Sequence, residues 1–173
     1  MVPSLEIGPA DLLQSSMLHI VLYQPEIPDN TGNVGRTCVA LRAKLWLVRP
    51  LGFRLDDRHL RRAGLDYWQH LDWEAVDDWP SLLQRLPGCR PWFFSKRAAR
   101  CYTDAAYAPN DVLVFGSESQ GLPSTLLEQH PDRCLQIPMA EEARCLNLAV
   151  SVAVAAYEAH RQCTHLAESS ISR

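Results

Sequence analysis

The sequence predicts a single-domain α/β fold in which a mostly parallel sheet is flanked by helices. Short apolar, β-prone runs alternate along the chain with segments of helical pattern, which is typical of β-α-β units. Polar motifs directly follow several of these runs, as ligand-binding loops do at the carboxyl ends of parallel strands. With 173 residues, the chain is long enough to bury one hydrophobic core.

The composition is typical of a globular protein, with 47% hydrophobic residues, 21% charged residues and a net charge of −3. No apolar run approaches the roughly 18–20 residues of a membrane span, and the N-terminus lacks the basic and apolar regions of a secretory signal. The six cysteines show no metal-ligand spacing. We therefore expect a cytoplasmic protein with free thiols, no metal site and no membrane segment.

The first elements follow from β-prone residues and from caps. Residues 1–16 lack a sustained pattern and are expected to be a disordered extension before a strand at 18–23. Prolines interrupt the chain after this strand, and Asp29 or Asn30 can cap a helix that reaches Leu41.

The middle of the chain is less regular. A second strand is expected at 45–48, where proline and glycine follow it, and a short helix at 56–63, where paired aspartates suit the positive helix start. The stretch 65–86 is ambiguous, although 80–86 has a helical pattern. The sequence therefore predicts the secondary structure of 65–86 less completely than that of the segments before and after it.

The C-terminal half returns to a clear alternation. Strands are expected at 92–94, 111–115 and 134–137, and a helix at 123–130 that starts with a proline, which the first turn tolerates. The segment 146–162 is rich in Ala, Val and Leu without a breaker and predicts the last helix. The domain is therefore expected to span 17–163, with a frayed polar tail over 164–173.

Three polar motifs follow predicted strands, at 30–36, 115–122 and 137–148. Singly, each has a structural explanation: a turn with a helix cap, two turn glycines, and a buried asparagine with backbone partners. Jointly, they predict one ligand site at the carboxyl edge of the sheet. The phosphate-binding and dinucleotide-binding glycine motifs and the zinc motif H-E-x-x-H are absent, which disfavours those classes of site.

Further stretches, at 20–28, 60–67 and 157–159, complete a resemblance that extends over about 17–161. The chain resembles the SPOUT-class RNA 2′-O-ribose methyltransferases, and within them the TrmL (YibK-like) group of tRNA (cytidine/uridine-2′-O-)-methyltransferases. This resemblance implies a deep C-terminal trefoil knot in the sheet. It also implies a homodimer that uses S-adenosylmethionine to methylate the wobble nucleotide 34 in the anticodon stem-loop of tRNA.

The resemblance also implies the site residues. The methyl donor is expected to contact Phe94, Gly116, Ile137, Cys145 and Leu146. The residues expected to serve catalysis are Arg36, Asn30, Glu118 and Asn147. Arg36 would hold a phosphate and stabilise the emerging alkoxide, because a protonated arginine is a poor base. Cys145 replaces the family's usual serine and is a weaker hydrogen-bond donor, so a somewhat lower donor affinity is expected.

RNA contacts are expected from basic clusters and one aromatic residue, although such clusters alone also fit solvated surfaces. These candidates are Arg58, Arg61, Arg62, Lys96, Arg97 and Tyr157. Tyr157 equally fits a packed helix interface. Three other functions stay open: methylation of ribosomal RNA or of another tRNA position, a non-catalytic RNA- or S-adenosylmethionine-binding role, and a nucleophilic role of Cys145.

Overall fold

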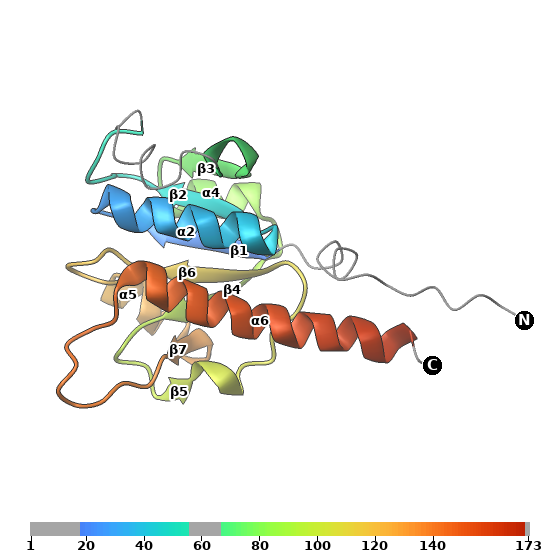
Figure 1. Ribbon diagram of the computed structural model, residues 1–173. Coiled ribbons are helices and arrows are strands. Elements are labelled where there is room, and N and C mark those ends of the chain that lie inside the picture. The colour runs from blue at the N-terminus through green and yellow to red at the C-terminus, as the bar shows by residue number, and fades with distance from the viewer. Residues whose placement is uncertain (1–17, 56–66, 172–173) are drawn as a thin grey trace, which may run out of the picture.

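The computed structural model describes residues 18–55 and 67–171. The expected extension over 1–16 and the expected helix at 56–63 lie outside these ranges. The strands are β1 (His19–Tyr23), β2 (Lys44–Val48), β3 (Trp73–Val76), β4 (Arg90–Phe94), β5 (Arg100–Cys101), β6 (Asp111–Phe115) and β7 (Cys134–Gln136). The helices are α2 (Pro28–Leu41), α4 (Trp79–Arg85), α5 (Ser124–Glu128) and α6 (Leu148–Ile171), with 3₁₀ turns η1 (Trp68–His70), η2 (Tyr102–Asp104) and η3 (Pro131–Arg133) (Figure 1).

The strands of the described ranges form one seven-stranded sheet with the order β3-β2-β1-β6-β4-β7-β5. Every pair in it is parallel, so all carboxyl ends lie along the same edge. The α/β prediction is therefore confirmed. The sequence analysis missed β3 and β5, since β3 is only partly buried and β5 has two residues, so neither shows an apolar run.

Helices cover both faces of the sheet, because successive side chains of a strand point to opposite faces. On β6, Leu113 and Phe115 pack in the cluster beneath α2 and α6. Val112 and Val114 pack in the opposite cluster, with Leu82 of α4 and Leu126 of α5. In Figure 1, α2 and α6 run side by side over the first of these faces.

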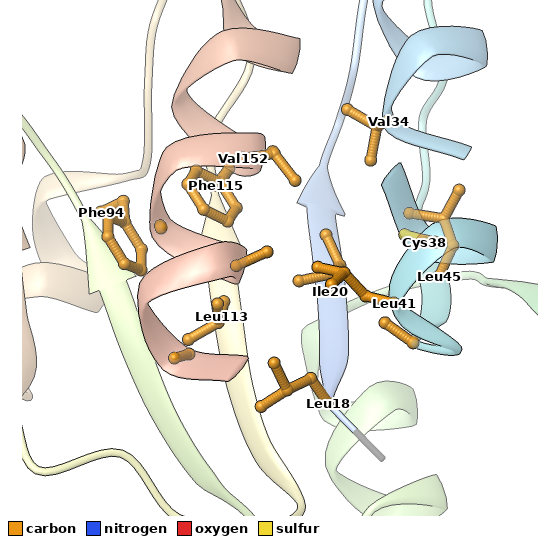
Figure 2. Close-up of a cluster of buried hydrophobic side chains, with 14 of the residues drawn as sticks. Leu18, Ile20, Val34, Cys38, Leu41, Leu45, Phe94, Leu113, Phe115 and Val152 are labelled. Carbon is orange, nitrogen blue, oxygen red and sulfur yellow. The ribbon is translucent and has the colours of Figure 1, made fainter. Parts of the chain in front are cut away.

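The layer under α2 and α6 is the larger part of the core (Figure 2). The fully buried side chains Ile20 and Leu113 lie between the two helices and the sheet. On α6, Ala155, Ala156 and Ala159 are fully buried, and their small size lets the helix backbone approach the sheet closely. This packing fixes the N-terminal ends of both helices above the carboxyl edge of the sheet.

Two helix boundaries differ from the sequence-based expectation. No side chain of α2 caps its start: the cap position is Ile27, and Pro28 occupies the first turn. The last helix begins at Leu148 and continues to Ile171, so the expected end at Gln162 is wrong, and the backbone of the expected tail is helical as far as Ile171. Polar residues are compatible with a helix that already has a buried face, because packing rather than propensity supplies most helical stability.

We predict that Leu113→Ala lowers the free energy of unfolding by about 2–5 kcal/mol, because it removes a fully buried side chain from the central strand. Leu83→Ala is the matched control, since Leu83 is 40% exposed and its change should cost much less. Urea denaturation of both variants measures the difference. Equal losses in the two variants would contradict this assignment of the core.

Candidate active site

The three polar motifs meet at the carboxyl edge of the sheet, where β6, β4 and β7 are neighbours. They enclose a cavity of about 490 Å³, here called the first cavity. All five residues expected to contact the methyl donor line it: Phe94, Gly116, Ile137, Cys145 and Leu146. Five more expected site residues line it too: Asn30, Glu118, Asn147, Lys96 and Arg97. Residues 115–121 and 137–148 therefore contribute to one site, as the sequence predicts.

The inner wall of the first cavity is apolar. The rings of Phe94 and Phe115 stack there, with centroids 4.5 Å apart and planes inclined by 14°. Phe94 and Phe115 end the adjacent strands β4 and β6 and are paired in the sheet, which brings the two rings together. Leu122 and Ile137 extend this apolar surface.

A chain of hydrogen bonds joins the three polar residues expected to serve catalysis. Asn147 Nδ2 donates to Asn30 Oδ1 at 2.9 Å, and Asn30 Nδ2 donates to Glu118 Oε1 at 2.9 Å. Asn30 is only 8% exposed, so its amide is largely removed from water. These contacts link residues up to 117 positions apart and hold the three motifs in fixed relative positions.

Glu118 and Asn147, at the two ends of this series of hydrogen bonds, accept hydrogen bonds from amides at the N-termini of two helices. The Glu118 carboxylate accepts hydrogen bonds from the backbone amides of Glu26 at 2.8 Å and of Ile27 at 3.3 Å, just before α2. Asn147 Oδ1 accepts from the amides of Ala149 at 2.9 Å and Val150 at 3.4 Å in the first turn of α6. A carboxylate suits the positive end of α2, and an asparagine is a preferred cap for α6.

The loop after β6 is closed on itself. The amide of Gly121 donates to the carbonyl of Ser117 at 2.9 Å, and Ser117 and Gly121 form an antiparallel bridge. A Cβ atom at Gly116 would lie far inside van der Waals contact with the backbone of Gly121 and Leu122, so this position requires glycine. The motif glycine therefore permits a close approach of two backbone segments.

Arg36 is not among the residues that line the first cavity. It lies six residues after Asn30 on α2, which turns its side chain by about 240° and moves it about 9 Å along the helix. Its guanidinium lies 5.4 Å from the ring centroid of Tyr67. Linear proximity in the motif therefore does not bring Arg36 to the hydrogen-bonded chain of Asn30, Glu118 and Asn147.

The expected RNA-contact residues fall into three groups. Lys96 and Arg97 are exposed and line the first cavity. Tyr157 lies on α6 away from the cavity lining and is 53% exposed. Arg58, Arg61 and Arg62 lie outside the described residues. Arg144 was not singled out as an RNA contact, yet it lines the first cavity, and its position directly before Cys145 was the available signal.

The first cavity suits a ligand with both an aromatic ring and hydrogen-bonding groups. Its apolar wall offers contact area for a ring. Among the described residues, no group accepts a hydrogen bond from the backbone amides of Cys145 or Leu146, which line the same cavity.

The described part of the chain also contains no group of three or more metal-ligating side chains, and none of its helices could span a membrane.

A model of the SpoU rRNA Methylase family matches residues 17–157, so the chain belongs to this family. A tRNA (cytidine(34)-2′-O)-methyltransferase of Methylovorus glucosotrophus is 42% identical over 147 residues, which are 84% of this chain and 96% of that relative. The enzyme of the same name from Saccharophagus degradans is 43% identical over 153 residues, again 84% of this chain and 96% of the relative.

Solved structures agree with this assignment. One, from work on the 2′-OH methylation of C/U34 on tRNA, has 52% identity and a TM-score of 0.82 and covers 86% of this chain and 97% of its own. The SpoU methyltransferase AviRb of Streptomyces viridochromogenes, in complex with the cofactor AdoMet (S-adenosylmethionine), has 24% identity and a TM-score of 0.71. It covers 86% of this chain and 58% of its own. The AdoMet in that complex belongs to AviRb, and the solved structures of this family imply the knotted fold expected here.

We predict that Asn30→Ala lowers the free energy of unfolding by about 1–3 kcal/mol, because it leaves the Asn147 amide without its partner and removes a hydrogen bond to a carboxylate. Asn33→Ala is the matched control, since Asn33 is exposed on the same helix and the change in helix propensity is identical. Thermal or urea unfolding compares the two. A loss no larger than that of the control would show that the polar chain contributes nothing to stability.

Proposed function

We propose that this chain transfers a methyl group from S-adenosylmethionine to the 2′-hydroxyl of the cytidine or uridine at position 34 of tRNA. The observation that carries this proposal is the first cavity, where the five donor-contact positions and the chain of Asn30, Glu118 and Asn147 meet. Relatives that carry the name of this reaction are 42–43% identical over most of the chain.

The donor fits the first cavity by chemistry. Its adenine would lie against the apolar wall that includes Ile137 and Leu122, and the free amides of Cys145 and Leu146 would donate to its polar atoms. When bound, S-adenosylmethionine supplies an electrophilic methyl group on a positively charged sulfur. The chain's contribution is to exclude water and to align the acceptor in line with that methyl group.

The acceptor RNA would be held by cations at the rim. Lys96, Arg97 and Arg144 line the first cavity, and phosphates supply most of the affinity of RNA for such a surface. Arg36, exposed on α2 outside the lining of the first cavity, would bind a phosphate of the same strand and so position the acceptor ribose. The hydroxyl proton leaves to solvent, because a guanidinium is already protonated.

A homodimer would cover the exposed apolar surface formed by the start of α2 and by α6. Apolar side chains are exposed on or next to these helices: Ile27 by 44%, Val150 by 48% and Tyr157 by 53%. Val150 and Tyr157 are seven residues apart and share one face of α6. Packing of a second copy there would bury this face, and a tRNA substrate would locate the enzyme in the cytoplasm.

The proposed activity is tested with purified protein, S-adenosylmethionine and tRNA from a strain that lacks this modification. Mass spectrometry of the nucleosides should detect new 2′-O-methylcytidine or 2′-O-methyluridine. Arg36→Ala should reduce the rate by about 100-fold, since it removes the phosphate contact that positions the acceptor ribose. Arg36→Lys should retain more activity, because it keeps the positive charge.

Arg85→Ala is the control for this assay, because Arg85 pairs with Glu74 at the far side of the molecule and lines neither site cavity. It should methylate tRNA at the wild-type rate. An Arg36→Ala rate equal to that of the control would remove Arg36 from the mechanism. A methyl group on a base instead of a ribose would refute the proposed reaction.

Cys145→Ser should preserve or increase the affinity for the methyl donor. The side chain is exposed and lines the first cavity, and a hydroxyl donates a stronger hydrogen bond than a thiol of similar size. Isothermal titration with S-adenosylhomocysteine and the methylation assay measure the two effects. Abolished methylation with intact donor binding would instead identify Cys145 as a nucleophile.

A further inference from the structure

A second cavity, of about 600 Å³, lies next to the first one at the same edge of the sheet. Its lining comes from the carboxyl ends of four strands. These residues are Tyr23, Gln24 and Glu26 at and after the end of β1, residues 50–52 after β2, Arg97 after β4, and Ser117 with residues 120–124 after β6. Its volume falls within the roughly 300–1,000 Å³ of small-ligand sites. The methyl donor is assigned to the first cavity, and the hydrogen-bonded residues Asn30, Glu118 and Asn147 do not line the second one. The proposed function therefore gives the second cavity no ligand.

The two cavities share one wall. Arg97, Ser117 and Gln120 line both of them. The wall is held in place by Glu26, whose carboxylate accepts hydrogen bonds from the Ser119 amide at 3.0 Å and from the Ser119 hydroxyl at 2.6 Å. A polymer strand could therefore occupy both cavities at once, with one unit on each side of this wall.

The sheet topology singles out the same place. From β1 the chain continues through α2 to β2 on one side, whereas from β6 it continues through α5 to β7 on the other side. In open α/β sheets, the crevice between two such strands is the usual ligand site. The second cavity occupies this crevice, and the first cavity lies one strand further along, over β6, β4 and β7.

The walls of the second cavity carry groups that suit a nucleotide. Among the described residues, the Gln24 Oε1 atom and the Gln120 side-chain amide have no hydrogen-bond partner, and both side chains line the cavity. An amide offers a donor and an acceptor, as the edge of a base requires. Arg97 has no acidic partner in the described part of the chain, and its guanidinium suits a phosphate.

We propose that the second cavity binds a nucleotide adjacent to the methylated one, with Arg97 at the phosphate that joins the two. This assignment rests on the proposed RNA substrate and adds to it a specificity subsite. The bases of a single-stranded loop are splayed outward and can enter separate pockets. Gln24 and Gln120 would contact the neighbouring base, while the acceptor ribose lies in the first cavity.

The proposal is tested with a variant that fills the second cavity with a large side chain, at a residue that is not among the proposed catalytic residues. Ser124 is the exposed first residue of α5 and lines the second cavity alone, so Ser124→Trp blocks it without disturbing a buried contact. Thr125→Trp is the matched control, since Thr125 is exposed on the same helix and lines neither cavity. Gln24→Asn is a second, milder variant that keeps a residue type tolerant of the left-handed backbone at this position, where φ is 53°.

Fluorescence anisotropy measures binding of an anticodon stem-loop RNA, in its intact form and with an abasic nucleotide on either side of position 34. For the wild type, one of the two abasic RNAs should bind about tenfold more weakly. Ser124→Trp should bind the intact RNA about tenfold more weakly, and the abasic change should then have no further effect. Gln24→Asn should show a smaller loss, and Thr125→Trp should match the wild type.

Affinity for S-adenosylhomocysteine, measured by titration calorimetry, should be unchanged in all variants, because the donor occupies the other cavity. The proposal is overturned if Ser124→Trp binds RNA as Thr125→Trp does, or if it retains the full abasic effect. These binding results do not depend on methyl transfer. Methylation by the wild type without the Ser124→Trp effect refutes the subsite alone, whereas the full binding pattern without methylation refutes the proposed reaction alone.

Discussion

The Glu118 carboxylate is the interaction on which the geometry of the site depends. It accepts hydrogen bonds from the amides of Glu26 and Ile27 and from the side chain of Asn30, and so joins the loop after β6 to the start of α2. Asn30 in turn receives the amide of Asn147, which caps α6. The Glu118 carboxylate thus fixes the start of α2 directly and the start of α6 through Asn30 and Asn147. Hydrogen bonds to a charged group are stronger than those between neutral groups.

This arrangement explains why the first and second cavities are separate. The Glu26 carboxylate accepts a hydrogen bond from the Ser119 amide in the loop after β6, and the Glu26 amide donates to the Glu118 carboxylate in the same loop. These two hydrogen bonds hold the loop between the two cavities. The methyl donor and the acceptor nucleotide would meet on one side, and a neighbouring nucleotide would lie on the other. In the proposed reaction, Asn30, Glu118 and Asn147 would act as positioning residues, and Arg36 would contact RNA from the exposed surface of α2.

The sequence was sufficient to predict the parallel sheet and a cavity at its carboxyl edge, because apolar strands and the polar residues that follow them are local signals. It was insufficient for the start of α2, since its cap is Glu118, a residue 91 positions from Ile27. The position of Arg36 did have a signal, because six helical residues separate it from Asn30 and turn it to another side of α2. The second cavity had no sequence signal, because Gln24, residues 50–52 and Ser124 belong to three separate segments that only the sheet order brings together.

The most direct measurement is a crystal structure of the protein with S-adenosylhomocysteine. The ligand should lie in the first cavity, with its adenine near Ile137 and its polar atoms at the amides of Cys145 and Leu146. The second cavity should stay free of it, although that crevice is where open α/β sheets usually bind nucleotides. Density for the ligand between the ends of β1 and β6 would contradict both the site assignment and the reaction built on it.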